Sequence, residues 1–121
     1  MGYPPPMLDR PVSVVEFPGY RRRADELLAP DEQAAVVDLI AFNPTCGDLI
    51  PGTGGLRKVR IGRAGSGKRG GARVIYYFYN TDHPVLLLTL YAKSEKADVT
   101  ERDKKMFIAL VKEIVAQWQR K

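Results

Sequence analysis

Cysteine and histidine are nearly absent from this chain of 121 residues, which contains one of each, Cys46 and His83. A single cysteine cannot form an internal disulfide, so a reducing compartment, the cytoplasm, is the expected location. One cysteine and one histidine cannot supply the roughly four ligands of a zinc site. A cysteine nucleophile usually has a base beside it, and the chain has a single histidine to offer. We therefore expect no metal ion, no cofactor and no thiol chemistry.

Long apolar runs are also missing. The longest extends from Val85 to Leu90, well short of the ~18–20 residues of a membrane span. Residues 1–6 lack the basic end and the apolar core of a signal peptide, so no membrane association is expected. The length suits one domain. Four prolines in residues 1–11 predict a flexible tail, with a single domain over residues 12–121.

Acidic residues are missing from the middle of the chain, where none occurs between Asp48 and Asp82. The same segment contains seven basic residues: Arg57, Lys58, Arg60, Arg63, Lys68, Arg69 and Arg73. A block of one sign creates a local potential that attracts polyanions. A solvated, charged loop is the alternative. We favour binding, because these residues alternate with strand residues on a glycine-rich scaffold, and we predict an RNA-binding hairpin over residues 56–73.

The hydrophobic pattern predicts an α+β fold. The expected elements are a strand at 12–17, helices at 20–28 and from Pro30 to Pro44, strands at 56–61, 72–79 and 85–91, and a helix beginning at Thr100. Short connections make the last three strands an antiparallel meander. With the N-terminal strand they form a small antiparallel sheet, packed against two N-terminal helices and a C-terminal helix.

Several details of these elements can be predicted. In the alternating pattern of residues 56–61, Leu56, Val59 and Ile61 cannot share one face, which predicts an irregularity near Lys58. The strand at 85–91 is apolar on both faces, so it lies centrally under helices. Thr100 begins a capping-box pattern. The last helix has an apolar stripe consisting of Phe107, Leu110, Val111, Ile114 and Trp118.

Glycine motifs in the hairpin do not indicate a nucleotide site. Gly62 to Lys68 satisfies G-x-x-x-x-G-K, but Arg69 replaces the Ser or Thr of a P-loop, and a strand follows where a helix should receive the phosphates. Gly65 to Gly70 matches G-x-G-x-x-G without the parallel βαβ unit of a dinucleotide fold. The chain is too short to hold the catalytic lobe of a kinase.

Three longer segments resemble a known family. They are GTGGLRKVR at 52–60, GSGKRGGARVIYY at 65–77, and LTLYAKSEK at 88–96 followed by Asp98-Val99-Thr100. These segments are similar to those of the HigB toxins of type II toxin–antitoxin systems, in the RelE/ParE superfamily, over roughly residues 12–118. The resemblance implies a RelE-like fold and a ribosome-dependent endoribonuclease that cleaves mRNA. It also implies a paired helix-turn-helix antitoxin of the HigA type, and mRNA and ribosomal RNA as partners.

The resemblance also implies site residues. Lys58 and Arg60 match the basic pair of the family's first meander strand, Arg73 the arginine that opens the next strand, and Lys93 a lysine after the last strand. Two positions depart from the founding branch, which has an arginine where this chain has Ser94 and a tyrosine where it has Thr100. Tyr91 and Lys93 are the candidates to replace them.

Metal-independent cleavage of RNA uses the substrate's 2′-OH as the nucleophile against the adjacent phosphate. His83, alone in a turn, is interpreted as a surface residue. Crowded cations disfavour a protonated lysine, so Lys58, between Arg57 and Arg60, is the favoured base. Arg60 and Arg73 would hold the phosphate through their planar forks, and Lys93 would be the acid.

The remaining cations of the hairpin have a simpler predicted task, which is to position RNA phosphates: Arg57, Arg63, Lys68 and Arg69. Some of the residues assigned to catalysis could also serve only this purpose. Among the aromatic residues of 76–79, alternate side chains must face the core. By parity with Arg73, Tyr77 and Tyr79 are the members that could face outward and stack on bases.

Two other functions fit parts of the sequence. One is a non-catalytic RNA- or ribosome-binding module on the same fold, which the departures at Ser94 and Thr100 favour. The other is a DNA-binding repressor, which is weakly supported because the basic residues lie on strands and not on a helix. The sequence therefore predicts RNA binding from its charges and cleavage from its resemblance.

Overall fold

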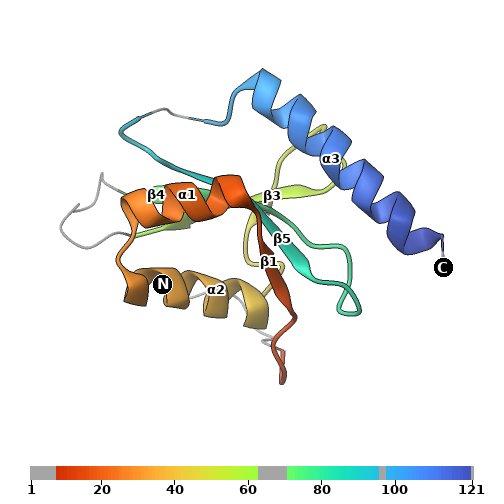
Figure 1. Cartoon of the computed structure of the whole chain (residues 1–121), viewed down its shortest axis with the longest axis horizontal. Coiled ribbons are helices and arrows are strands. Elements are labelled where there is room, and N and C mark those ends of the chain that lie inside the picture. Colours follow the sequence, from red (N-terminus) through yellow and green to blue (C-terminus); the bar gives the residue numbers. More distant parts are fainter. Residues whose placement is uncertain (1–7, 63–70, 96–97, 121) are drawn as a thin grey trace.

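The computed structural model describes residues 8–62, 71–95 and 98–120. Figure 1 shows the arrangement of the elements. In chain order they are β1 (Val14–Glu16), α1 (Pro18–Leu27), α2 (Pro30–Phe42), β2 (Asp48–Leu49), β3 (Leu56–Ile61), β4 (Ala72–Tyr77), β5 (Val85–Ala92) and α3 (Glu101–Gln119). The α+β class and the arrangement of two N-terminal helices and a C-terminal helix are confirmed.

The described strands form one sheet with the order β1-β5-β4-β3-β2. The predicted meander is confirmed, since β3, β4 and β5 pair antiparallel in sequence. β1 pairs parallel to β5, with Val14 opposite Val85, so the sheet is mixed and not antiparallel throughout. A chain that leaves β1 through two helices is free of the hairpin constraint that forces antiparallel pairing. The two-residue strand β2 lies in a segment for which the hydrophobic pattern predicted no strand.

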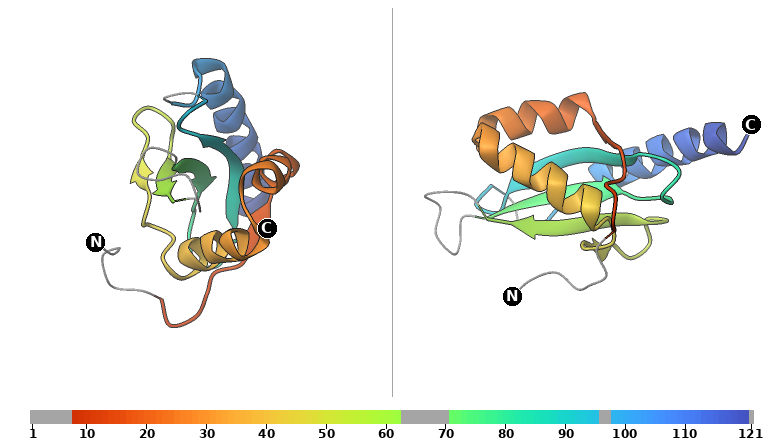
Figure 2. Two further views of the ribbon diagram at one scale, coloured as in Figure 1. Left: turned by 90° about the vertical axis from the view of Figure 1, so that its left-hand side faces the viewer. Right: turned by 90° about the horizontal axis from the view of Figure 1, so that it is seen from below.

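Helices cover both faces of the sheet, as the two views of Figure 2 show. One core cluster joins the inner sides of α1 and α2 to Val59, Ile61 and Leu90. The other joins α3 to Leu56 and Ile75. Alternate residues of a strand therefore pack into a hydrophobic core on either side of the sheet. This is why β5 has apolar side chains on both faces.

The irregularity predicted near Lys58 is wrong. All six residues of β3 pair in unbroken register with β4. Leu56 packs under α3, while Val59 and Ile61 pack under the other helices. Because both faces of the sheet are covered, these three apolar residues can lie on different faces of a regular strand, and no bulge is needed. The register shift lies instead between Ile75 and Tyr76 of β4, which pair with Thr89 and Leu87.

The predicted start and apolar stripe of α3 are confirmed. The Thr100 hydroxyl oxygen accepts a hydrogen bond from the Asp103 N–H at 3.0 Å, which satisfies one of the free N–H groups of the first turn. Phe107 and Val111 are buried, and the other stripe residues pack around them. α1 begins at Pro18, two residues before the predicted start, because proline is well suited to the first turn of a helix.

Part of the predicted tail is fastened to the domain. The Leu8 N–H donates to the Phe42 carbonyl at 2.9 Å, and the Val12 N–H donates to Ala41 at 2.9 Å. The Leu8 side chain packs on the first core cluster. Residues 8–11 are thus held against the end of α2, whereas residues 1–7 lie outside the described ranges.

Candidate nucleic-acid interface

The antiparallel register brings four predicted site residues to one end of the sheet. Arg60 of β3 lies directly opposite Arg73 of β4, and Arg73 lies directly opposite Tyr91 of β5. Lys58 is two residues before Arg60 and so faces the same side. This is the side on which Leu56 packs. We call Lys58, Arg60, Arg73 and Tyr91 the basic face, and it lies on the α3 side of the sheet.

A carboxylate that sequence reasoning missed lies within the basic face. The Lys58 ammonium is 3.3 Å from Asp98 Oδ1. The Tyr91 hydroxyl donates to the same oxygen at 3.3 Å, and the Val99 N–H donates to it at 2.8 Å. Asp98 follows the last strand in a segment without regular structure, and its place in the resemblance was the only signal that could have drawn attention to it.

Electrostatics in this network follow from burial and hydrogen bonding. Partial burial works to raise the pKa of Asp98, but hydrogen bonds from the Val99 N–H, Lys58 and Tyr91 and the Lys58 charge outweigh it and hold this pKa below its ordinary value. Tyr91 is 2% exposed, and burial, with the charge of Asp98, raises the pKa of its phenol to about 12. At neutral pH the network thus consists of a carboxylate acceptor and a protonated tyrosine donor.

Arg73 is the feature of this face that most clearly requires a ligand. Among the residues that the structure describes, its Nη1 is buried and has no hydrogen-bond partner. A buried donor of a charged group that lacks a partner costs on the order of 1–3 kcal/mol. Arg60, directly across the ladder, places a second positive charge opposite the first, which is also unfavourable. An anion bound between the two arginines would relieve both costs.

One other predicted cation that the structure describes, Arg57, does not join the basic face. Arg57 points to the opposite side of the sheet, where its Nη1 donates to the Gly47 carbonyl at 2.7 Å and the Thr45 carbonyl at 3.4 Å. Lys93 is exposed just after β5, and its backbone N–H donates to Gly71 at 3.0 Å, beside the start of β4. Arg63, Lys68 and Arg69 lie outside the described residues.

The environment of Lys58 differs from the predicted one. Arg57 lies on the other face of the sheet, and the charged group in contact with Lys58 is the Asp98 carboxylate. The argument from crowded cations therefore no longer supports Lys58 as the base. The residue remains at the centre of the site, held in place by an ion pair.

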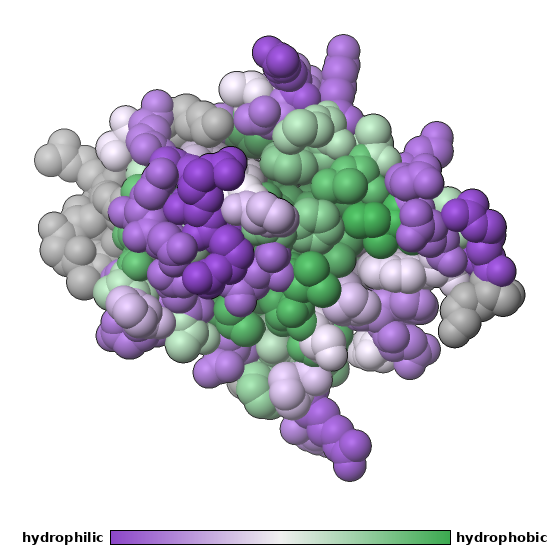
Figure 3. Space-filling model, viewed as in Figure 1, coloured by the Kyte–Doolittle hydropathy of each residue, from purple (hydrophilic) through white to green (hydrophobic). Residues whose placement is uncertain are grey.

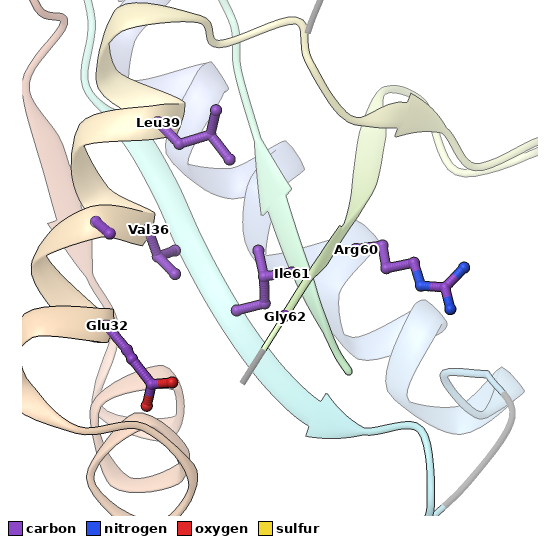
Figure 4. Close-up of a pocket in the computed structure, with 7 residues that line it drawn as sticks. Glu32, Val36, Leu39, Arg60, Ile61 and Gly62 are labelled. Atoms are coloured by element: carbon purple, nitrogen blue, oxygen red, sulfur yellow. The ribbon is translucent and has the colours of Figure 1, made fainter. Parts of the chain in front are cut away.

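The hollow between α2 and the end of β3 is separate from this face. Glu32, Val36 and Leu39 of α2 line it together with Arg60, Ile61 and Gly62. Figure 4 shows the Arg60 side chain extending away from α2, while Ile61 points toward it. The carboxylate of Glu32 accepts a hydrogen bond from the Ala29 N–H at 2.7 Å. An aliphatic hollow with an acidic edge is unsuited to RNA.

The expectation that Tyr77 faces outward is wrong. Tyr77 is 8% exposed and belongs to the core under α3, because α3 covers the side of β4 that Tyr77 shares with Ile75. Tyr79 is partly exposed, and its ring lies 5.6 Å from that of Trp118. His83 lies in the turn, as predicted, and stacks on Trp118 with ring centroids 4.5 Å apart. These aromatic rings pack on α3, and none joins the basic face.

Cys46 has no activating base among its described contacts. Its sulfur is 3.8 Å from the Tyr76 hydroxyl, and burial raises the pKa of the thiol above its ordinary value. In residues 8–62, 71–95 and 98–120 no three potential metal-ligating side chains come together. None of the helices in these ranges has the length and apolar character that a bilayer crossing demands.

Residues 47–121 match the family model described as the RelE toxin of the RelE/RelB toxin–antitoxin system. The chain belongs to the RelE toxin family. The matched segment begins just before β2 and ends after α3, so it contains the whole basic face and Asp98. β1, α1 and α2 lie before it and contribute the first core cluster. RelE toxins are the toxic components of toxin–antitoxin systems, and the family part of the predicted resemblance is confirmed, while the HigB subtype stays a prediction.

Proposed function

We propose that this RelE family member is a HigB-type toxin that cleaves mRNA on the ribosome without a metal ion. Family membership supports the toxin role. The observation that carries RNA binding is the buried Nη1 of Arg73, which has no hydrogen-bond partner among the described residues and lies on the same face as Lys58 and Arg60. A site of action on ribosomes would place the protein in the cytoplasm.

The two arginines are the proposed phosphate ligands. A guanidinium presents two parallel N–H groups to a phosphate, which fixes its orientation as well as its charge. Arg60 and Arg73 lie opposite each other on paired strands, so one phosphate could contact both. The rigid ladder beneath them would hold this geometry before the substrate arrives, which reduces the cost of ordering the site.

Cleavage at this phosphate would follow the 2′-OH route. The 2′-OH gives its proton to a water molecule of the solvent as its oxygen attacks phosphorus, the bond from phosphorus to the 5′-oxygen breaks, and the products are a 2′,3′-cyclic phosphate and a 5′-hydroxyl. Positive charge aimed at the phosphorane stabilises the transition state, and Lys58, Arg60 and Arg73 supply it. Lys58 would face the 2′-OH, and Lys93, exposed beside the start of β4, would protonate the leaving oxygen.

The non-catalytic alternative has one structural observation in its favour. Thr100, which replaces the family's tyrosine, is committed to capping α3 through its hydroxyl oxygen. The hydroxyl of Tyr91, which lies opposite Arg73, donates its proton to Asp98 in a hydrogen bond. A module that binds ribosomal RNA and does not cut it would use the same arginines. Such a module would not need the arginine and the tyrosine that Ser94 and Thr100 replace.

Induced expression with mRNA end mapping tests the proposal. We expect growth arrest with the wild type, together with new mRNA ends inside coding regions and only on ribosome-bound messages. Arg73→Ala should restore growth and remove the cuts. Arg22→Ala is the matched control, because Arg22 is exposed on α1 and outside the basic face, and it should remain toxic.

The possible results separate the two functions. A wild type that neither arrests growth nor cuts mRNA contradicts the cleavage proposal. Salt-sensitive binding to ribosomes without cuts would establish the non-catalytic module instead.

The proposed partner is a small helix-turn-helix antitoxin of the HigA type. Toxins of this family act in toxin–antitoxin pairs, so we expect the partner to be encoded by the adjacent gene. Co-expression of that gene should abolish growth arrest and yield a complex that co-purifies. An adjacent gene that encodes no such protein would count against the HigB assignment.

A further inference from the structure

Asp98 is an acidic residue that contacts the basic face directly, through hydrogen bonds from Lys58 and Tyr91. Its Oδ1 accepts from Lys58 of β3, Tyr91 of β5 and its own neighbour Val99. The side chain is 54% exposed. Three donors from three segments of the chain therefore converge on one oxygen atom at the surface.

A carboxylate at this position opposes the binding of a phosphate. Its negative charge reduces the local positive potential that attracts RNA, so it is not a device for affinity. It does hold the Lys58 ammonium, which lies at the end of a flexible side chain, and it accepts a hydrogen bond from the Tyr91 hydroxyl. A lysine has four rotatable carbons and three rotating donors, and an ion pair restricts it to one position.

The groups that face Asp98 come from every element around it. Lys58 and Tyr91 come from the sheet, and Lys104 comes from α3. The hydrogen bond to Glu101 is the main cause that raises the pKa of Lys104, and the charge of Asp98 adds to it. Lys104 itself pairs with Glu101 at 2.7 Å. Arg73 lies next to Tyr91, whose phenol is within reach of the arginine charge. Asp98 thus links the loop before α3 to the cationic strands.

We propose that Asp98 is a positioning residue, which holds the Lys58 ammonium and the Tyr91 hydroxyl in place beside the phosphate ligand Arg73. The inference rests on the proposed RNA cleavage and deepens it. Asp98 acts through Lys58 and Tyr91 and does not itself contact the phosphate, so its contribution is to the rate of the chemical step and not to the binding of RNA. Its fixed geometry places the lysine charge where the phosphorane forms.

The test is cleavage of a defined mRNA on programmed ribosomes, with the toxin in excess, to obtain the maximal rate and the half-saturating concentration separately. Loss of a charge-assisted hydrogen bond corresponds to about a tenfold effect on rate. We therefore expect Asp98→Ala to lower the maximal rate about tenfold. The half-saturating concentration should stay unchanged or fall, because a negative charge has been removed.

Two variants make the test specific. Asp98→Asn keeps an oxygen acceptor at the same place and should recover most of the lost rate. Asp82→Ala is the matched control, since Asp82 is an exposed carboxylate in the turn at the opposite end of β5, and it should behave as the wild type. Circular dichroism and the thermal midpoint show whether each variant is folded.

Each other outcome overturns the inference. A higher half-saturating concentration at unchanged maximal rate would mean that Asp98 serves binding. A faster Asp98→Ala would mean that it blocks the site, and an Asp98→Asn as slow as Asp98→Ala would mean that its charge or its basicity is used directly. If the wild type cuts and Asp98→Ala equals it, this inference alone fails. If the wild type does not cut at all, the proposed function fails and this inference falls with it.

Discussion

Two buried tyrosines show how the contribution of a hydroxyl group to stability depends on its hydrogen-bond partners. Tyr20 and Tyr76 are both fully buried. The Tyr76 hydroxyl donates to the Pro44 carbonyl at 2.8 Å and accepts from the Gly47 N–H at 2.8 Å. Within the described residues, the Tyr20 hydroxyl has no partner. The hydroxyl of Tyr76 therefore links the 44–47 loop to β4, whereas the hydroxyl of Tyr20 is a buried polar group without a compensating hydrogen bond among the described residues.

This contrast gives a matched pair of substitutions. Tyr76→Phe leaves the Gly47 N–H and the Pro44 carbonyl without their partner and should lower the free energy of unfolding by about 1–3 kcal/mol. Tyr20→Phe removes only an unsatisfied group and should leave this free energy unchanged or raise it by about 1 kcal/mol. Urea denaturation of the three proteins measures both effects. A destabilised Tyr20→Phe would show that the Tyr20 hydroxyl has a partner after all.

The tyrosines also predict how stability depends on alkaline pH. Burial raises the pKa of Tyr20 to about 12 from 10.0, and that of Tyr91 to the same value. Between these pH values the unfolded chain loses phenolic protons that the folded protein keeps, so ionisation favours unfolding. The stability contributed by these groups is complete below pH 10 and is lost as the pH rises toward 12. Denaturation series over this range should show the fall, and Tyr20→Phe should make it shallower.

Residue-level chemistry was only partly predictable from the sequence. The pattern of charges predicted the basic hairpin, the family resemblance pointed to Lys58, Arg60 and Arg73 within it, and strand register brings these three to one face. Asp98 could not be found in this way, because a loop residue has no periodicity that would place it against a strand. Arg57 belongs to the same basic run, but the alternation of side chains along β3 places it on the other face of the sheet.

Elements with strong local signals were predicted well, and those fixed by distant pairing were not. α2 and α3 have proline or threonine at their starts and clear apolar stripes, and both lie where expected. The direction of β1 depends on β5, which is far away in the chain. The register shift at Ile75 and Tyr76 depends on both β4 and β5. Neither can be read from one strand alone.

Thr100 is expected to stabilise α3 and to take no part in the reaction. Its oxygen caps α3, so Thr100→Ala should lower the free energy of unfolding by about 1 kcal/mol. The cleavage rate at a temperature where both proteins are folded should not change. Thr100→Ser keeps the acceptor and is the control for stability. A lower rate in a stable Thr100→Ser variant would instead indicate that position 100 takes part in the reaction.

Across the whole molecule, charge and apolar surface are separated. In the view of Figure 3, apolar side chains gather between α1 and α3, and the exposed large hydrophobic residues of the described surface include Val15 and Met106. The basic face lies at the end of the sheet where Arg73 and Tyr91 pair. Charged groups near α1 are mostly neutralised, since Arg21 and Arg23 both pair with carboxylates. The long-range attraction for RNA should therefore come mainly from the central hairpin and little from the helices.

This separation can be measured through the salt dependence of RNA binding. Each phosphate neutralised on a single strand contributes about 0.7 to the slope of log affinity against log salt. With an RNA carrying 2′-O-methyl groups, which cannot be cut by 2′-OH attack, Arg60→Ala and Arg73→Ala should each reduce the slope, and the double variant should reduce it by about 0.7, because the proposed site holds one phosphate between the two arginines. Arg57→Ala is the matched control from the same strand, because Arg57 binds backbone carbonyls on the other face, and its slope should equal that of the wild type. If Arg57→Ala reduces the slope as much as Arg73→Ala does, the RNA contacts both faces of the sheet, and the interface is larger than the basic face.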